Sequence, residues 1–243
     1  MFLLPKDFWE IKETHKGRGV FAKQDIEPGV IIGDYLGKLI HDDDDYDLQE
    51  EYGFYSLSYN DDTTIWPDIT KPGVYLINHS CTPNIYMYTY LGHSLYFALR
   101  KIFAGEELTV SYIMSPADAD CDPCEHQCHC KSDLCTGTMH MTKEHFDAWN
   151  AWDDELIKDF KFPTVVYGQD LPQLSTYPKN IADDPIFPLF GAAHHKQLIR
   201  NDRELPSQEA IRKIIRETGQ KIFFKNQKIT VLGVAYNRII SPV

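Results

Sequence analysis

The chain is short of positive charge. Its 243 residues carry 24 Lys and Arg against 36 Asp and Glu, which gives a formal net charge of −12 at pH 7. Sequence-independent DNA binding needs a surface rich in Lys and Arg, so we expect no direct nucleic-acid binding. Acidity favours basic partners instead, such as Lys- and Arg-rich peptides, although solubility alone also explains it.

Long hydrophobic runs are missing too. No stretch approaches the roughly 20 apolar residues of a membrane span, so we expect no membrane association. Pro5, Asp7 and Glu10 stand where a signal peptide has an apolar run. We therefore expect an intracellular protein, in the cytoplasm or nucleus, or one exported by a specialised route. In a reducing compartment, cysteines serve as metal ligands rather than disulfides.

The hydrophobic runs before residue 115 are short and are separated by turns rich in glycine and proline. A run at 30–32 follows a turn at 27–29, and another at 108–110 follows a turn at 104–106. We also predict a turn at 17–19 before a strand at 20–22, and a buried strand at 94–100. This pattern indicates an assembly of small β-sheets rather than βαβ units.

An acidic segment at 41–64 interrupts this pattern, and we expect either a solvated insertion or one wall of a groove that attracts cations. After residue 140, apolar periodicity and capping residues predict helices near 146–160, 193–200 and 207–219. A hairpin is predicted around Asn226-Gln227. The C-terminal hundred residues either recognise a partner or buttress the rest.

The expected fold is therefore mainly β, with a mostly α-helical C-terminal extension, and α+β overall. We expect three parts: 1–115, which includes the acidic insertion, then a cysteine-rich loop at 116–140, and the extension at 141–243. No internal repeat or low-complexity tract divides the chain further.

Five of the six cysteines lie between residues 121 and 135. Structural zinc takes four ligands in a tetrahedron, and Cys128, Cys130 and Cys135 supply three thiolates in one loop. Cys81 is the only cysteine outside this stretch, which makes it the natural remote ligand. The competing candidates are Cys121 and Cys124. Lesser candidates are His126, His129 and His140.

Three other features carry little weight singly. The glycines around Arg18 leave backbone amides open to a ligand. Asn78 and His79 stand beside Cys81, where polar side chains often contact a cofactor or support a metal ligand, although a core histidine is the simpler reading for His79 alone. Tyr112 ends an apolar strand, but its position alone would not select it among 14 tyrosines.

Together these runs resemble the SET-domain protein lysine methyltransferases with a post-SET zinc loop. The resemblance covers roughly residues 7–140 and rests on five motifs in the order that the family has them. The matching segments are residues 16–22, 34–37, 77–84, 97–112 and 128–135.

The resemblance implies small curved sheets in which the segment 77–84 threads beneath a loop, a knot-like crossing. It also implies S-adenosylmethionine as cosubstrate and a bound zinc ion. Tyr112 would be the catalytic tyrosine and Tyr35 would line the lysine channel. The implied cofactor contacts are Lys16, Gly17, Arg18, Gly19, Tyr75, Asn78 and His79. The implied zinc ligands are Cys81, Cys128, Cys130 and Cys135.

The function that follows is methylation of lysine in a basic protein segment, such as a histone tail. Some positions depart from the family pattern: the segment 71–75 differs, Asp34 stands in place of the usual Glu, and Ser111 in place of the usual Asp. These departures motivate an alternative, a zinc-stabilised binding module that has kept the fold without catalysis. The number of methyl groups transferred and the oligomeric state stay open.

Overall fold

The computed structural model describes the first 141 residues more fully than the remainder. The described residues are 1–41, 55–60, 63–90, 93–118, 121, 123–133, 135–141, 143, 146–147, 170–171 and 173–181, with the backbone of three strands between 222 and 237. Most of the acidic segment and nearly all of the three predicted C-terminal helices lie outside these residues. Those expectations stay predictions.

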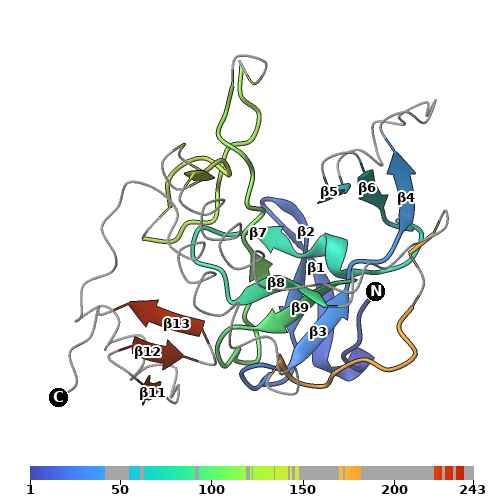
Figure 1. Ribbon diagram of the computed structural model, residues 1–243, viewed down its shortest axis with the longest axis vertical. Coiled ribbons are helices and arrows are strands. Elements are labelled where there is room, and N and C mark those ends of the chain that lie inside the picture. Colours follow the sequence, from blue (N-terminus) through green and yellow to red (C-terminus); the bar gives the residue numbers. More distant parts are fainter. Residues whose placement is uncertain are drawn as a thin grey trace.

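A two-stranded antiparallel sheet opens the fold (Figure 1). The 3₁₀ turn η1 (Lys6–Phe8) leads into β1 (Trp9–Thr14), which pairs with β2 (Gly17–Ala22) so that Thr14 lies opposite Gly17. The predicted turn at 17–19 is therefore wrong, because the turn occupies only the two residues before Gly17. Gly17 has a φ of +90°, which glycine adopts without a Cβ clash, and the chain is extended from there onward.

The central sheet has the order β3-β9-β8, with β3 at Ile31–Asp34, β9 at His93–Ala98 and β8 at Ile85–Tyr90. Every residue of β9 is buried, which confirms the predicted buried strand. Successive side chains of a strand point to opposite faces. Accordingly, Tyr96 packs in one hydrophobic cluster and Phe97 in another, so both faces of the sheet are covered.

A third small sheet holds β4 (Lys38–His41), β6 (Thr63–Trp66) and β5 (Leu57–Asn60), in that order and all antiparallel. In Figure 1 it stands at the upper right, beyond the end of β3. Tyr55 comes just before β5, so this sheet delivers an aromatic residue to the region near β3.

A parallel pair of very short strands joins two distant runs of the sequence. The 3₁₀ turn η2 (Val74–Leu76) leads into β7 (Asn78–His79), which pairs in parallel with β10 (Thr109–Val110). This pairing places the Asn78 run beside the segment that ends at Tyr112. The knot-like threading expected here stays a prediction.

A later segment, 173–181, packs against the second face of the central sheet. Ile181 is buried there in the cluster that holds Phe97. The Tyr177 hydroxyl donates to Asp34 Oδ2 at 2.8 Å, and the same oxygen lies 2.7 Å from His93 Nδ1. Asp34, which departs from the family pattern, thus joins β3, β9 and this late segment.

The three C-terminal strands form a sheet of their own. β11 (Ile222–Lys225) pairs antiparallel with β12 (Lys228–Val231), which confirms the predicted hairpin, and β13 (Val234–Asn237) adds a strand that was not predicted. The mainly β character is therefore confirmed for the described residues. Within them, no helix has both the length and the apolar character needed to cross a membrane.

Candidate active site and metal centres

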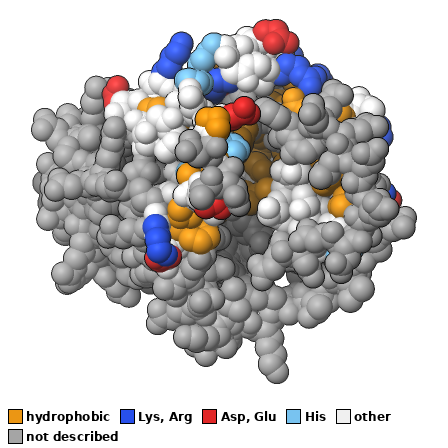
Figure 2. All heavy atoms as spheres, turned by 90° about the horizontal axis from the view of Figure 1, so that it is seen from above, with side chains coloured by type: hydrophobic (Ala, Val, Ile, Leu, Met, Phe, Trp, Pro, Cys, Tyr) orange, Lys and Arg blue, Asp and Glu red, His pale blue; other side chains and the backbone are white. Residues whose placement is uncertain are grey.

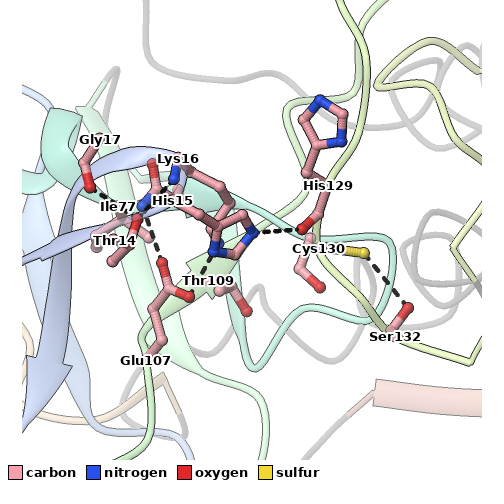
Figure 3. Close-up of polar contacts among 12 residues, drawn as sticks. Thr14, His15, Lys16, Gly17, Ile77, Glu107, Thr109, His129, Cys130 and Ser132 are labelled. Atoms are coloured by element: carbon pink, nitrogen blue, oxygen red, sulfur yellow. Dashed lines mark hydrogen bonds and ion pairs between the residues drawn. The ribbon is translucent and has the colours of Figure 1, made fainter.

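One end of the candidate site is a polar cluster at the β1–β2 turn (Figure 3). Lys16 Nζ forms an ion pair with Glu107 Oε2 at 2.9 Å. The amide of Asn78 donates to Glu107 Oε1 at 2.9 Å and to the carbonyl oxygen of Arg18 at 3.1 Å. Three of the predicted cofactor residues therefore meet around Glu107. Its role was missed, although Glu107 lies in a motif that the sequence singled out.

The glycines of β2 have distinct reasons for lacking a side chain. A Cβ on Gly19 would lie 2.8 Å from Asn78 Nδ2 and 2.8 Å from Glu107 Oε1, closer than such atoms approach. A Cβ on Gly17 would meet no atom within 4 Å. Gly19 is thus required for β2 to pack on the polar cluster, while the backbone at Gly17 is open to a ligand.

His79 connects the candidate catalytic tyrosine to a candidate zinc ligand. The backbone N–H of Tyr112 donates to His79 Nδ1 at 3.2 Å, so Nδ1 is the unprotonated nitrogen and Nε2 carries the hydrogen. His79 Nε2 lies 3.7 Å from Cys81 Sγ, a geometry in which Nε2–H points toward sulfur. The buried imidazole is thus committed to the protein on both sides.

Tyr112 has a desolvated hydroxyl at the second end of the site. The residue is 43% exposed, yet its hydroxyl lies where burial raises the pKa of Tyr112 to about 12. The hydroxyl donates to the carbonyl oxygen of Ile77 at 3.3 Å. Because one phenol hydrogen is used there, the oxygen lone pairs are left to accept from a ligand.

Other tyrosines gather around this end. The Tyr35 hydroxyl donates to the carbonyl of Tyr55, and the Tyr35 ring stacks on Tyr96 with centroids 6.1 Å apart. Burial raises the pKa of both Tyr35 and Tyr96, and the neighbouring Tyr112 adds to each shift. Tyr35 therefore lies near Tyr112, and its place in a lysine channel stays a prediction. The sequence did not predict that Tyr96 lies near the site, because a buried strand has side chains on both faces and its sequence does not show which face borders the site.

Tyr75, a predicted cofactor contact, packs edge-on against Tyr55 at a centroid distance of 5.0 Å. Its single hydroxyl hydrogen is shared between the carbonyl oxygens of Ile69 at 3.1 Å and Lys71 at 2.9 Å. The ring therefore packs with the other tyrosines through Tyr55, and its hydroxyl is held by the preceding loop.

The six cysteines and two of the histidines separate into two groups. The four-cysteine cluster has all its sulfur atoms within 4.8 Å of one another, and it joins Cys81 to the loop cysteines as the spacing predicted. The Cys/His cluster has the same compactness. The members of the four-cysteine cluster are Cys81, Cys128, Cys130 and Cys135, and those of the Cys/His cluster are Cys121, Cys124, His126 and His140.

Zinc fits the four-cysteine cluster by its donor chemistry. Thiolates are ligands that zinc prefers, and Zn–S bonds of about 2.3 Å place two sulfurs of a tetrahedron roughly 3.8 Å apart. The sulfurs of Cys81 and Cys128 lie 3.6 Å apart. Burial raises the pKa of both thiols, so a metal ion would have to displace protons to bind them.

The cysteine loop also contacts the polar end of the site (Figure 3). His15 Nε2 lies 2.9 Å from the carbonyl oxygen of His129, which stands between two of the loop cysteines. Since the carbonyl can only accept, His15 Nε2 is the donor. His129 was a lesser candidate for metal binding, and its side chain belongs to neither cluster of described residues.

Residues 17–113 match the SET domain family, so the chain contains a SET domain over this range. The match begins at β2, ends just beyond Tyr112, and includes both halves of the β7–β10 pair. The match stops before the cysteine loop. The case for metal binding by that loop therefore rests on the geometry of its own side chains.

Several histone-lysine methyltransferases are similar to this chain. One from Gibberella zeae, named as H3 lysine-36 specific, is 34% identical over 139 residues, which cover 52% of this chain and 14% of that protein. One from Saccharomyces cerevisiae, with the same specificity in its name, is 32% identical over 138 residues, 53% of this chain and 18% of that protein.

A trithorax histone-lysine N-methyltransferase from Drosophila virilis is 36% identical over 118 residues, 44% of this chain and 3% of that protein. The chain thus spans less than a fifth of the length of each of these relatives.

Proposed function

We propose that this chain is an S-adenosylmethionine-dependent protein lysine N-methyltransferase that acts on a basic protein segment. The observation that carries the proposal is the junction of β7 and β10, which sets the Tyr112 hydroxyl on the carbonyl of Ile77, beside the Asn78 run. The SET domain over residues 17–113 supports it, as do the names of the similar proteins.

The bound cosubstrate would supply a methyl group on a positively charged sulfur. As the lysine nitrogen forms the new N–C bond, the S–C bond breaks and its electron pair stays on sulfur. A free lysine has a pKa near ~10.4, so it must first lose a proton. An apolar aromatic wall disfavours the ammonium and lowers that pKa, which is the role we assign to Tyr35 and Tyr96.

Tyr112 would orient the reacting groups. Its hydroxyl donates to the carbonyl of Ile77, which leaves the oxygen lone pairs as acceptors. Those lone pairs can accept an amine hydrogen or a weak C–H contact from the methyl group. Placement of the two reactants, rather than proton abstraction in the transfer step, then carries most of the catalysis.

The polar end would hold the cosubstrate. Lys16, Gly17, Arg18 and Gly19 would contribute mainly through backbone, and Gly17 is the position where that backbone is open. Asn78 belongs to the same polar cluster, and His79 and Tyr75 would support it from within the protein, where their polar atoms are bonded. Glu107 joins this set as a supporting residue, because it fixes the side chains of both Lys16 and Asn78.

The four-cysteine cluster would bind one structural zinc ion, and the loop that carries three of its cysteines would be a post-SET loop. Cys81 then fastens the loop to the SET domain, and the contact between His15 and His129 places the loop against the β1–β2 hairpin, which would hold the cosubstrate. Zinc would act on catalysis only through this placement.

The substrate is proposed to be a histone or another basic segment. The overall charge of −12 favours a basic partner, and two similar proteins are named as H3 lysine-36 specific. Described charged side chains on the face in Figure 2 are of both signs around a hydrophobic centre. We therefore assign the steering of a basic substrate to the excess of Asp and Glu in the sequence of the acidic segment 41–64. A histone substrate also favours a nuclear location.

The test is incubation with methyl-labelled cosubstrate and separate histones, followed by mass spectrometry of the labelled protein. Histone H3 is compared with a matched H3 variant that has arginine in place of the lysine named in the relatives. Labelled lysine in any basic protein, absent with Tyr112→Phe, is the expected result. No cosubstrate binding by calorimetry would instead support the non-catalytic module.

A further inference from the structure

We propose that the Cys/His cluster binds a second zinc ion, separate from the ion of the four-cysteine cluster. Its members come from a Cys-x2-Cys-x-His run and from a residue near the end of the loop. The SET domain match ends before this loop. The proposal therefore rests on the geometry of these four side chains.

The distances within the cluster fit a tetrahedron. With Zn–S bonds of about 2.3 Å and Zn–N bonds of about 2.05 Å, neighbouring S and N ligands should lie roughly 3.55 Å apart, and two N ligands roughly 3.35 Å apart. Cys121 Sγ lies 3.2 Å from His126 Nδ1 and 3.3 Å from His140 Nε2. Cys124 Sγ lies 3.9 Å from His126 Nδ1, and the two histidine nitrogens are 3.1 Å apart. All four separations are within a few tenths of an ångström of the expected values.

His140 is oriented for metal binding by its second nitrogen. Nδ1 lies 2.6 Å from the carbonyl oxygen of Ser115. Because a carbonyl only accepts, Nδ1 carries the hydrogen and Nε2 presents its lone pair to the cluster. Histidine ligands of zinc usually donate their other ring N–H in this way. His140 is also buried, so this lone pair has little access to solvent.

The backbone holds the two clusters in a fixed relation. Gln127 and Thr138 form an antiparallel bridge, and the N–H of Met139 donates to the carbonyl of His126 at 2.9 Å. On the other side of that bridge, the N–H of Cys128 donates to the carbonyl of Gly137 at 3.0 Å. This paired backbone thus carries His126 of the Cys/His cluster and Cys128 of the four-cysteine cluster two positions apart.

The second ion would fasten the chain that leaves the catalytic tyrosine. Met114 and His140 form a parallel bridge, and the N–H of Met141 donates to the carbonyl of Met114 at 3.0 Å. Met114 and Ser115 follow Tyr112 by two and three positions. This role rests on the proposed function, and it predicts weaker binding of the basic substrate when the second ion is lost.

The first experiment counts zinc in the purified full chain by elemental mass spectrometry. We expect two ions per chain in the parent, and one in the Cys121→Ser/Cys124→Ser variant and in His126→Ala. His126 is exposed, so its truncation should leave the fold intact, and His126→Cys should restore the second ion. His129→Ala is the matched control, because its side chain lies in neither cluster, and it should keep two. One ion in the parent, or two in His126→Ala, would overturn the proposal.

Cobalt(II) substitution identifies the ligands without any activity. The parent should show thiolate charge-transfer absorption from six sulfurs, and the Cys121→Ser/Cys124→Ser variant should lose the part due to the mixed site while keeping that of the four-cysteine site. An unchanged spectrum would contradict the assignment. The role is tested separately: His126→Ala should raise the KM for a basic peptide several-fold at unchanged cosubstrate affinity, and an unchanged KM would overturn the role alone.

Discussion

At the β1–β2 turn, the groups that border the site are charged and bonded to one another, whereas around Tyr112 they are aromatic and desolvated. Lys16, Glu107 and Asn78 form a closed set of polar contacts. The hydroxyls of Tyr35 and Tyr112 are instead held by backbone carbonyls within a hydrophobic wall. Under the proposed function, this difference would be a division of labour, in which one end recognises polar groups of a cosubstrate and the other keeps an amine neutral and aligned.

The largest effect is expected at the tyrosine end. Tyr112→Phe should lower turnover about 100-fold or more, the loss seen when one oriented group in an active site is removed. Cosubstrate affinity should stay the same, because the polar end is untouched. Steady-state kinetics and calorimetry measure the two separately. Tyr86→Phe is the control, because Tyr86 lies in the other hydrophobic cluster. Equal turnover in Tyr112→Phe and the parent would contradict the proposed division of roles between the two ends of the site.

The pH behaviour of Tyr112 should reflect its desolvation. Its folded pKa of about 12 exceeds the ordinary tyrosine value of 10.0, so between these values the folded state binds more protons than the unfolded state. The associated stability is present below pH 10 and is lost as the pH rises through 12. The difference between the ultraviolet titrations of the parent and of Tyr112→Phe should isolate a tyrosine that ionises near pH 12, apart from the other buried tyrosines. Ionisation of that residue near its ordinary pKa would mean that its hydroxyl is not desolvated.

Removing zinc tests how far the metal loop supports both ends. Chelation should weaken cosubstrate binding about tenfold or more, a usual size for coupling between linked sites, because His129 contacts the hairpin and Cys81 contacts His79. Calorimetry before and after chelation, with zinc added back as the control, measures this. Unchanged cosubstrate affinity after complete zinc loss would show that the cysteine loop does not support the β1–β2 hairpin.

The polar end is tested through Lys16. Lys16→Met should weaken cosubstrate binding about tenfold, because it removes the ion pair that holds Glu107 and, through Glu107, the side chain of Asn78, and hydrogen bonds to charged groups contribute roughly 1.5–3 kcal/mol. Lys101→Met breaks an ion pair with Asp25 and Glu27 away from the site and serves as the control. Turnover at saturating cosubstrate should change little. A Lys16→Met enzyme with normal affinity and poor turnover would reverse the roles assigned to the two ends.

The residues that could be predicted from sequence are those with rare chemistry or a fixed local motif. Cys81 was predicted because three loop thiolates leave one tetrahedral position, and the structure places it with them. The buried strand at β9 was predicted from its continuous apolar run. The Gly17 turn was placed too late, because glycine marks positive φ without saying on which side of it the strand begins.

The missed residues depend on how distant segments cross. Glu107 acquires its role only when β10 brings it to Lys16 and Asn78, and Tyr96 only through the face of β9 on which it lies. Tyr177 reaches Asp34 from 143 positions away. Spacing along the chain could not divide the loop cysteines and histidines into two clusters, because that division depends on which strands of the loop pair.

The smallest expected effect is at His15, the residue that links the polar end to the cysteine loop. His15→Ala removes one hydrogen bond to the His129 carbonyl, which is worth about 1 kcal/mol, or roughly fivefold in cosubstrate affinity. If this contact carries the coupling, chelation should weaken binding less in His15→Ala than in the parent. The difference between the two chelation effects, measured by calorimetry, isolates the link from the metal site itself. Equal chelation effects would mean that coupling passes instead through Cys81 and His79, and so reaches the tyrosine end first.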